Sequence, residues 1–177
     1  FIELELNISL ATMLFYENKL EKAKALSMEN LQIISKLYGM ENVKRVETLN
    51  LIANILIEQG HCEEAEILLK DAISLSEIIY GPIHFLSIET TVNLITALAG
   101  QGNYKTAKET VSNLMKLRDV QKIKNFSWDK IIYVLRNFSE DLLDRLNILQ
   151  QTVRANIDNH GMEHQDTFQS LEILCEF

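Results

Sequence analysis

An internal repeat of 42 residues constrains the fold of this chain more than any other feature. The segment Glu58–Ile73 aligns with Gly100–Met115, and the same offset carries Leu-Tyr-Gly at 37–39 onto Ile-Tyr-Gly at 79–81. A small residue recurs in one register in three units, at Ala23, Ala65 and Ala107. Sequence periods of 20–50 residues are typical of repeat architectures. We therefore expect several copies of one structural unit stacked in a row.

Each unit is predicted to form two helices. Between residues 46 and 58, Leu49, Ile52 and Leu56 recur at three- and four-residue spacing, which predicts one buried helical face. Gly60 suits the left-handed conformation that ends a helix. A second helix is predicted at about 63–79, and Gly81-Pro82 ends it because proline cannot continue a helix. The alanine register indicates a close crossing of the two helices.

Composition agrees with an all-α fold and limits the partners. Only one Pro and six Gly occur among 177 residues, which argues against a turn-rich β-protein. The net charge of −8 argues against a non-specific nucleic-acid binder and favours a basic ligand. No stretch is apolar for long enough to span a membrane. Cys62 and Cys175 are expected to be free thiols in a reducing, cytoplasmic compartment.

The pattern resembles the tetratricopeptide repeat in the 42-residue form of kinesin light chains. The residues that match in the second unit are Leu49, Ile52, Ala53, Leu56, Gly60, Ala65, Leu69 and Ala72. In the third unit they are Leu94, Ile95, Leu98, Gly102, Tyr104, Ala107 and Val111. The family's Gly-x-x-His connector is approximated at 81–84 and 161–164. The resemblance implies an α-solenoid of antiparallel helix pairs in a right-handed superhelix.

We expect a single domain over residues 1–177, as a piece of a longer protein because the sequence begins without Met. Its units are predicted at about 1–39, 43–81, 85–124 and 126–161, with a half unit at 164–177. The fourth unit lacks the hairpin glycine and the register alanine. Its Trp128 either packs in the core or anchors a partner. The basic segment 116–124 is interpreted as a helix end and connector.

The sequence gives no support for catalysis, a metal or a cofactor. The nearest metal-like cluster is His61-Cys62-Glu63-Glu64, but adjacent helical side chains point about 100° apart and do not converge. His160 and His164 are separated by Gly161, which we expect to break a helix. Phosphate-binding, dinucleotide-binding, metalloprotease and serine-hydrolase motifs do not occur. We therefore expect that the chain is not an enzyme.

A concave groove lined by the first helix of each unit is the predicted binding site. Counted from the register alanine, its residues are Glu5, Ile8, Thr12, Phe15, Glu47, Asn50, Asn54, Ile57, Glu89, Val92, Asn93 and Thr96. The asparagine amides can pair with a peptide backbone of any sequence. The glutamates at 5, 47 and 89 either form an acidic stripe for a basic ligand or are ordinary solvated charges at helix N-termini.

The predicted function is a scaffold that binds a protein or peptide, with a ligand that carries basic side chains. Apolar anchors are expected at Phe15, Tyr16 and Ile57. A clamp for a C-terminal carboxylate is not expected, because the positions that the family uses for it contain no Lys or Arg: Ile8, Thr12, Leu51, Glu89 and Asn93. An alternative is a sensing or oligomerising domain of a larger signalling protein, in contact with further domains or repeats of the same chain.

Overall fold

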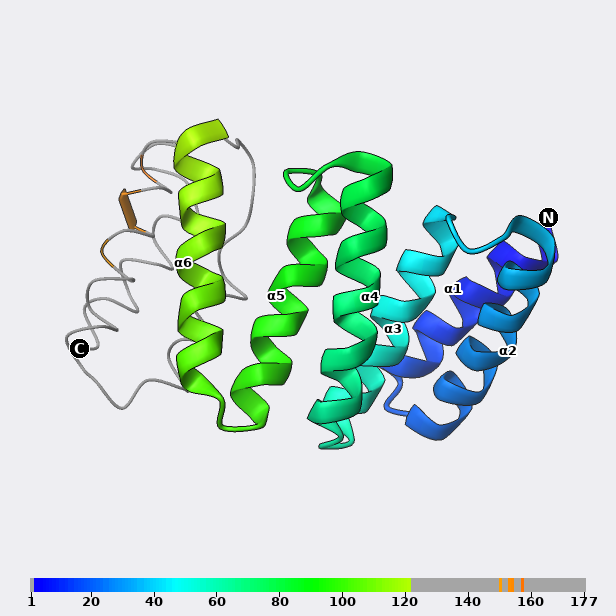
Figure 1. Cartoon of the computed structure of the whole chain (residues 1–177). Coiled ribbons are helices and arrows are strands. Elements are labelled where there is room, and N and C mark those ends of the chain that lie inside the picture. Colours follow the sequence, from blue (N-terminus) through cyan, green and yellow to red (C-terminus); the bar gives the residue numbers. More distant parts are fainter. Residues whose placement is uncertain (1, 122–149, 151–152, 155–156, 158–177) are drawn as a thin grey trace. The chain divides into compact units, whose positions relative to one another are not determined.

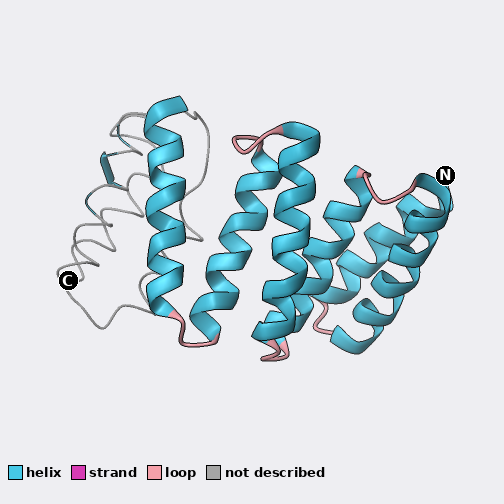
Figure 2. Cartoon of the chain, in the orientation of Figure 1, coloured by secondary structure: helices cyan, strands magenta, loops and turns pink. Residues whose placement is uncertain are grey.

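The computed structural model describes residues 2–121, 150, 153–154 and 157. Within these ranges the chain forms six helices and no strand (Figures 1 and 2). The helices are α1 (Ile2–Tyr16), α2 (Leu20–Tyr38), α3 (Val43–Glu58), α4 (Cys62–Tyr80), α5 (Phe85–Gly100) and α6 (Tyr104–Gln121). The all-α prediction is confirmed.

The chain contains two compact units, residues 1–103 and 104–177. The first contains α1 to α5, and the second contains α6, whose buried face carries Ala107, Val111 and Leu114. The predicted fourth unit and final half unit lie almost entirely outside the described residues. One domain over 1–177 therefore stays a prediction. None of the described helices is both long and apolar enough to cross a membrane.

The 42-residue offset recurs in the turns between helices. Gly60 has φ 80° and Gly102 has φ 76°, both in the left-handed region that glycine enters without steric cost. Asn18 occupies the corresponding position of the first unit and has φ 58°. Asparagine is among the few other residues that tolerate this conformation. The helix ends predicted from the repeat are therefore present in the backbone.

The connectors between repeat units also correspond, because each ends in a residue whose side chain caps the next helix. The Asn42 side chain accepts a hydrogen bond from the Lys44 N–H at 2.8 Å, and this cap begins α3 at Val43, where the second unit is predicted to start. One period later, Nδ1 of His84 accepts from the Leu86 N–H at 3.2 Å and caps α5. Each cap satisfies a backbone donor that the first helical turn leaves unpaired.

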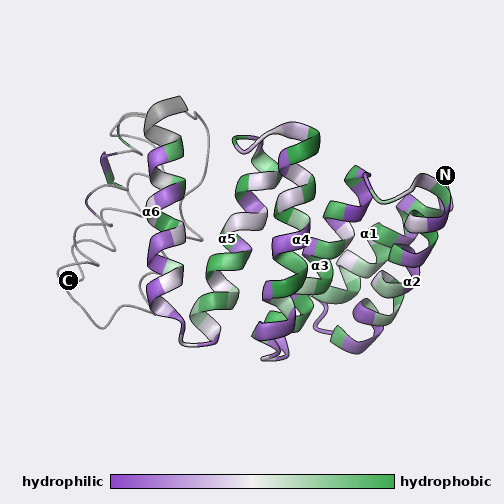
Figure 3. Cartoon of the chain, in the orientation of Figure 1, coloured by the Kyte–Doolittle hydropathy of each residue, from purple (hydrophilic) through white to green (hydrophobic). Residues whose placement is uncertain are grey.

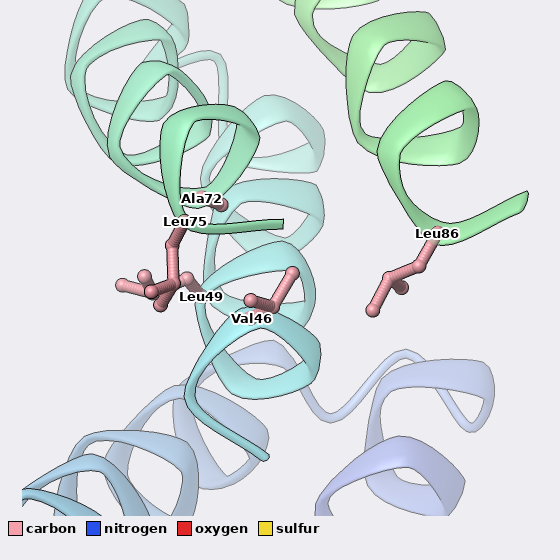
Figure 4. Close-up of a cluster of buried hydrophobic side chains, with 5 residues drawn as sticks. All are labelled: Val46, Leu49, Ala72, Leu75 and Leu86. Carbon is pink, nitrogen blue, oxygen red and sulfur yellow. The ribbon is translucent and has the colours of Figure 1, made fainter. Parts of the chain in front are cut away.

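Within residues 1–103 each helix packs against the next helix in sequence, and α3 also contacts α1 and α5. Hydrophobic and hydrophilic segments alternate along these helices (Figure 3), as expected for helices with one buried face. A central cluster joins α3, α4 and α5 through Val46, Leu49, Ala72, Leu75 and Leu86 (Figure 4). Complete burial of one such leucine stabilises the fold by about 1.5–3 kcal/mol.

Polar side chains link one hairpin to the next at the end of each first helix. In α3's C-cap, Nε2 of Gln59 donates to Oε1 of Glu21 on α2 at 2.7 Å. One period later, Nε2 of Gln101 donates to the Cys62 carbonyl at 3.0 Å and to Glu66 at 2.8 Å. The two glutamines therefore both link the end of a first helix to the second helix of the preceding hairpin, through partners at different register positions.

Candidate binding groove

A groove of about 280 Å³ runs across α1, α3 and α5, the first helices of three successive repeat units, all within residues 1–103. Side chains of α1, α3 and α5 form it, together with the end of α4 and the connector that follows. They are Thr12, Phe15, Tyr16, Val43, Glu47, Asn50, Leu51, Asn54, Tyr80, His84, Phe85, Leu86 and Glu89. Such a surface, shared by consecutive units, is the kind that repeat proteins use for extended ligands.

Aromatic rings line the groove from α1 and from the region where α4 ends and α5 begins. The Tyr80 and His84 rings are stacked, with centroids 4.0 Å apart and an interplanar angle of 13°. Phe85 follows, with its ring centroid 5.7 Å from that of His84, and its side chain is 65% exposed. On α1, Phe15 and Tyr16 meet edge to face at 5.5 Å. These rings offer a ligand apolar surface that the fold itself does not bury.

The charged side chains that line the groove are acidic. Glu47 and Glu89 lie one period apart on α3 and α5, and the lining includes no Lys or Arg. Nζ of Lys44 lies 3.0 Å from Oε2 of Glu47, at the start of the same helix. Both members of this pair remain more than a third exposed, so solvent weakens their attraction. The groove therefore favours positive charge on a ligand.

The amides of Asn50 and Asn93 bind each other rather than pointing freely into the groove. Nδ2 of Asn93 donates to Oδ1 of Asn50 at 3.1 Å, and Nδ2 of Asn50 donates to the Thr90 hydroxyl at 3.1 Å. Both asparagines are only 6% exposed. Their predicted role, hydrogen bonding to a peptide backbone, therefore needs revision: these groups connect α3 to α5. Asn54, which is half-buried and lines the groove, remains the candidate amide for a ligand.

The structure brings part of the predicted site together. Thr12, Phe15, Glu47, Asn50, Asn54 and Glu89 line one groove. The other predicted residues are absent from its lining: Glu5, Ile8, Ile57, Val92, Asn93 and Thr96. Val92 is 1% exposed and cannot contact a ligand in this conformation, which corrects its assignment to the groove surface. Of the three glutamates in one register, the groove therefore contains two.

Three residues of the groove lining are not predicted from the sequence: Tyr80, His84 and Phe85. Tyr80 belongs to the repeated Tyr-Gly marker, so its register with Tyr38 was a usable signal for a structural role. His84 was interpreted only as part of a connector. These residues lie at or beside helix ends, where the periodicity of a helical face does not reveal which way a side chain points.

A second hollow of about 260 Å³ surrounds the residues that had been considered as a metal cluster. Its lining is Gly60, His61, Cys62, Glu63, Glu64, Gly100 and Gln101. Cys62 is a free, buried thiol, and burial raises its pKa. Among the residues that the structure describes, no group of three His, Cys, Asp or Glu side chains could hold a metal ion. Trp128, His160, His164 and Cys175 lie outside the described residues.

Comparison with known proteins identifies the repeat. Residues 3–78 match the sequence profile of the tetratricopeptide repeat. This segment is a tetratricopeptide repeat array. Tetratricopeptide repeats generally bind protein partners. The resemblance predicted from the 42-residue register is thereby confirmed. No curated protein matches the chain.

Solved structures extend the likeness beyond the matched segment. Two crystal structures of a Podosopora anserina protein, described as a kinesin light chain with nearly identical TPR-like repeats, superpose with a TM-score of 0.79. Each alignment covers 98% of this chain and 84% of the other, at 17% sequence identity. At that identity the likeness shows a shared tetratricopeptide-type fold.

Proposed function

We propose that the chain is a scaffold whose groove binds a peptide segment of a partner protein with basic side chains. The observation that carries this proposal is the groove itself, which crosses three successive first helices and is lined by aromatic and acidic residues. A peptide laid across it would contact several units at once. The binding free energy would therefore be spread over the array.

Charge and aromatic surface together favour arginine on the ligand. Glu47 and Glu89 would attract a guanidinium group, and the faces of the exposed rings of Tyr16 and Phe85 would hold it by cation–π contact. Each such contact contributes about 0.5–2 kcal/mol, depending on how far it is removed from water. The side-chain amide of Asn54, which lines the groove, would hydrogen-bond the ligand backbone.

The remaining expectations from the sequence belong to the same proposal. We expect binding rather than turnover, a cytoplasmic location, and a continuous array over 1–177 within a longer protein. In this proposal the carboxylates of Glu47 and Glu89 attract the positive charge of the ligand. A regulatory role within a larger signalling protein would use the same groove and differ in what docking triggers.

Two libraries of fluorescein-labelled decapeptides test the ligand class by fluorescence polarisation. One library fixes Arg at two positions, and the other fixes Glu at the same two positions. We expect micromolar binding of the Arg library and none of the Glu library. Glu47→Gln combined with Glu89→Gln should weaken binding about 5–20-fold at 50 mM salt, and less at 500 mM because exposed charges are screened.

A matched variant separates the groove from overall charge. Glu41→Gln combined with Glu58→Gln removes two exposed carboxylates that do not line the groove. This control should bind like the parent chain, whereas Phe85→Ala should weaken binding with no change in net charge. Equal losses in the control and groove variants would reduce the effect to net charge and overturn the proposed site.

A further inference from the structure

Helix α1 carries an apolar stripe that the fold leaves uncovered. Leu6 is 63% exposed, Leu10 is 48% exposed and Met13 is 60% exposed. Their spacing of four and then three residues places them on one face of the helix. None of them lines the groove, so this stripe is a separate surface. Three large apolar side chains grouped on one face need an explanation that single exposed leucines do not.

The repeat register shows what this surface corresponds to. One period along the chain the same positions are occupied by Thr48, Ile52 and Ile55, and each is at most 1% exposed. Two periods along they are Thr90, Leu94 and Ala97, which are also buried. The positions are therefore interior positions of a tetratricopeptide unit, and they are exposed only in α1.

The neighbours of each first helix explain the difference. α3 packs against α4 of its own hairpin and also against α2 of the preceding hairpin, and α5 likewise packs against α4 before it. α1 packs against α2 and α3, with no preceding hairpin in the structure. The contact that α1 lacks, relative to α3, is the one with a preceding second helix. The exposed stripe marks the place for that helix.

We infer that the Leu6, Leu10 and Met13 face of α1 binds the second helix of another tetratricopeptide hairpin, joined ahead of residue 1 in the same polypeptide. This helix would lie antiparallel to α1, as α2 lies against α3. It would present an amphipathic face to the stripe. The inference concerns stacking of repeats and does not depend on what the groove binds.

The end of α1 adds a requirement on the incoming helix. Gln59 and Gln101 each donate a hydrogen bond to the preceding second helix, but the equivalent residue after α1 is Glu17. A carboxylate accepts hydrogen bonds and cannot donate them. The Glu17 carboxylate already accepts from Nζ of Lys19 at 2.6 Å, and both side chains are about half exposed. A further donor on the incoming helix, such as Lys, Arg or Gln where α2 has Glu21, would share this carboxylate.

An in-register graft tests the inference on the full chain. Residues 43–84 are duplicated ahead of Phe1, since Phe85 and Phe1 share one register position and no linker is needed. The copy carries Glu63→Lys as the donor facing Glu17. In the natural chain Leu10→Gln should change Tm by less than about 1 °C. In the grafted chain it should lower Tm by about 5 °C or more, as expected for a buried position.

Controls keep each outcome decisive. Glu5→Gln, an exposed change on α1 outside the stripe, should have the same small effect in both chains. A second graft duplicates residues 1–42 with Glu21→Lys in the copy, which presents α2 itself to α1. An equal, small effect of Leu10→Gln in natural and grafted chains would overturn the inference. So would failure of both grafts to unfold cooperatively.

Light scattering tests whether a second copy of the chain covers the stripe instead. If the natural chain is a dimer that Leu10→Gln converts to a monomer, a second copy covers the stripe and the proposed hairpin is overturned. We expect a natural chain whose oligomeric state Leu10→Gln does not change.

Discussion

The side-chain amide of Asn50 forms two hydrogen bonds between α3 and α5. It donates to the Thr90 hydroxyl and accepts from Asn93, with both atom pairs 3.1 Å apart. The Thr90 hydroxyl itself donates to the Leu86 carbonyl at 2.7 Å, so the network ends in the backbone of α5. Because these groups are nearly excluded from water, removing one partner leaves another unsatisfied.

We expect Asn50→Ala to lower the free energy of unfolding by about 1–3 kcal/mol, since it orphans the buried amide of Asn93. The double variant Asn50→Ala with Asn93→Ala should cost less than the two single changes added together. Urea unfolding followed by circular dichroism measures both quantities. Asn54→Ala, at the half-buried groove position, is the control and should cost well under 1 kcal/mol. Additive losses would show that the two amides are not coupled.

Gly100 lies close to the buried side chain of Cys62. A Cβ atom at Gly100 would lie 2.5 Å from the Cys62 Sγ, too close without movement of the buried thiol. In the parent chain, Gly100→Ala should therefore be neutral or destabilising, although alanine is favoured over glycine in a helix by about 1 kcal/mol. With Cys62→Ala the clash is absent, and Gly100→Ala should stabilise by about 0.5–1 kcal/mol. Urea unfolding of the parent, the two single variants and the double variant measures these effects. If Gly100→Ala changes the free energy of unfolding equally in the parent and in the Cys62→Ala chain, the steric clash is contradicted.

At the scale of elements, Glu66 couples α4 to α5 through Gln101. Its carboxylate accepts hydrogen bonds from Lys70 at 2.6 Å and from Gln101 at 2.8 Å, and these bonds lower its pKa below the ordinary value. The folded chain therefore favours the charged form. The resulting stabilisation is complete above the unfolded pKa, about 4.3 for glutamate, and is lost as the pH falls through the lower folded pKa.

The pH dependence of Tm tests this link. Glu66→Gln should lower Tm at pH 7, and the difference from the parent should shrink steadily between pH 5 and pH 3 as the parent's carboxylate becomes protonated. Glu77→Gln, at an exposed site on the same helix, controls for the loss of one charge. A difference in Tm that is constant with pH would show that the charge of Glu66 plays no part in the link.

The helices themselves were largely predictable, because their ends depend on local chemistry. Gly60 and Gly81 end helices through backbone conformations that few other residues adopt. The 42-residue register predicts the Gly60 turn at Asn18 as well, and Asn18 has a positive φ. α3 begins at Val43, where the second unit is predicted to start, although the apolar pattern used for the helix covers only residues 46–58, because Asn42 caps the helix from outside that pattern. A cap is a single side chain, and its signal is weaker than a periodic face.

At the scale of the whole molecule, the groove was predicted only in part. Its existence follows from the repeat, and Phe15, Glu47 and Asn54 were assigned to it from the register. The pairing of Asn50 with Asn93 was not predictable in the same way, because it depends on the angle at which one hairpin packs on the next. That angle is set by the packing of many side chains together and is not encoded in the period.

The short sequence separation of the links between hairpins bears on how the polypeptide acquires its structure during synthesis. Gln59 reaches back 38 residues to Glu21, and Asn93 reaches back 43 residues to Asn50. Closing loops of this length costs little entropy, and contacts between near neighbours favour rapid folding. A growing chain can therefore complete each hairpin on the one before it as soon as about forty further residues leave the ribosome, without waiting for its far end.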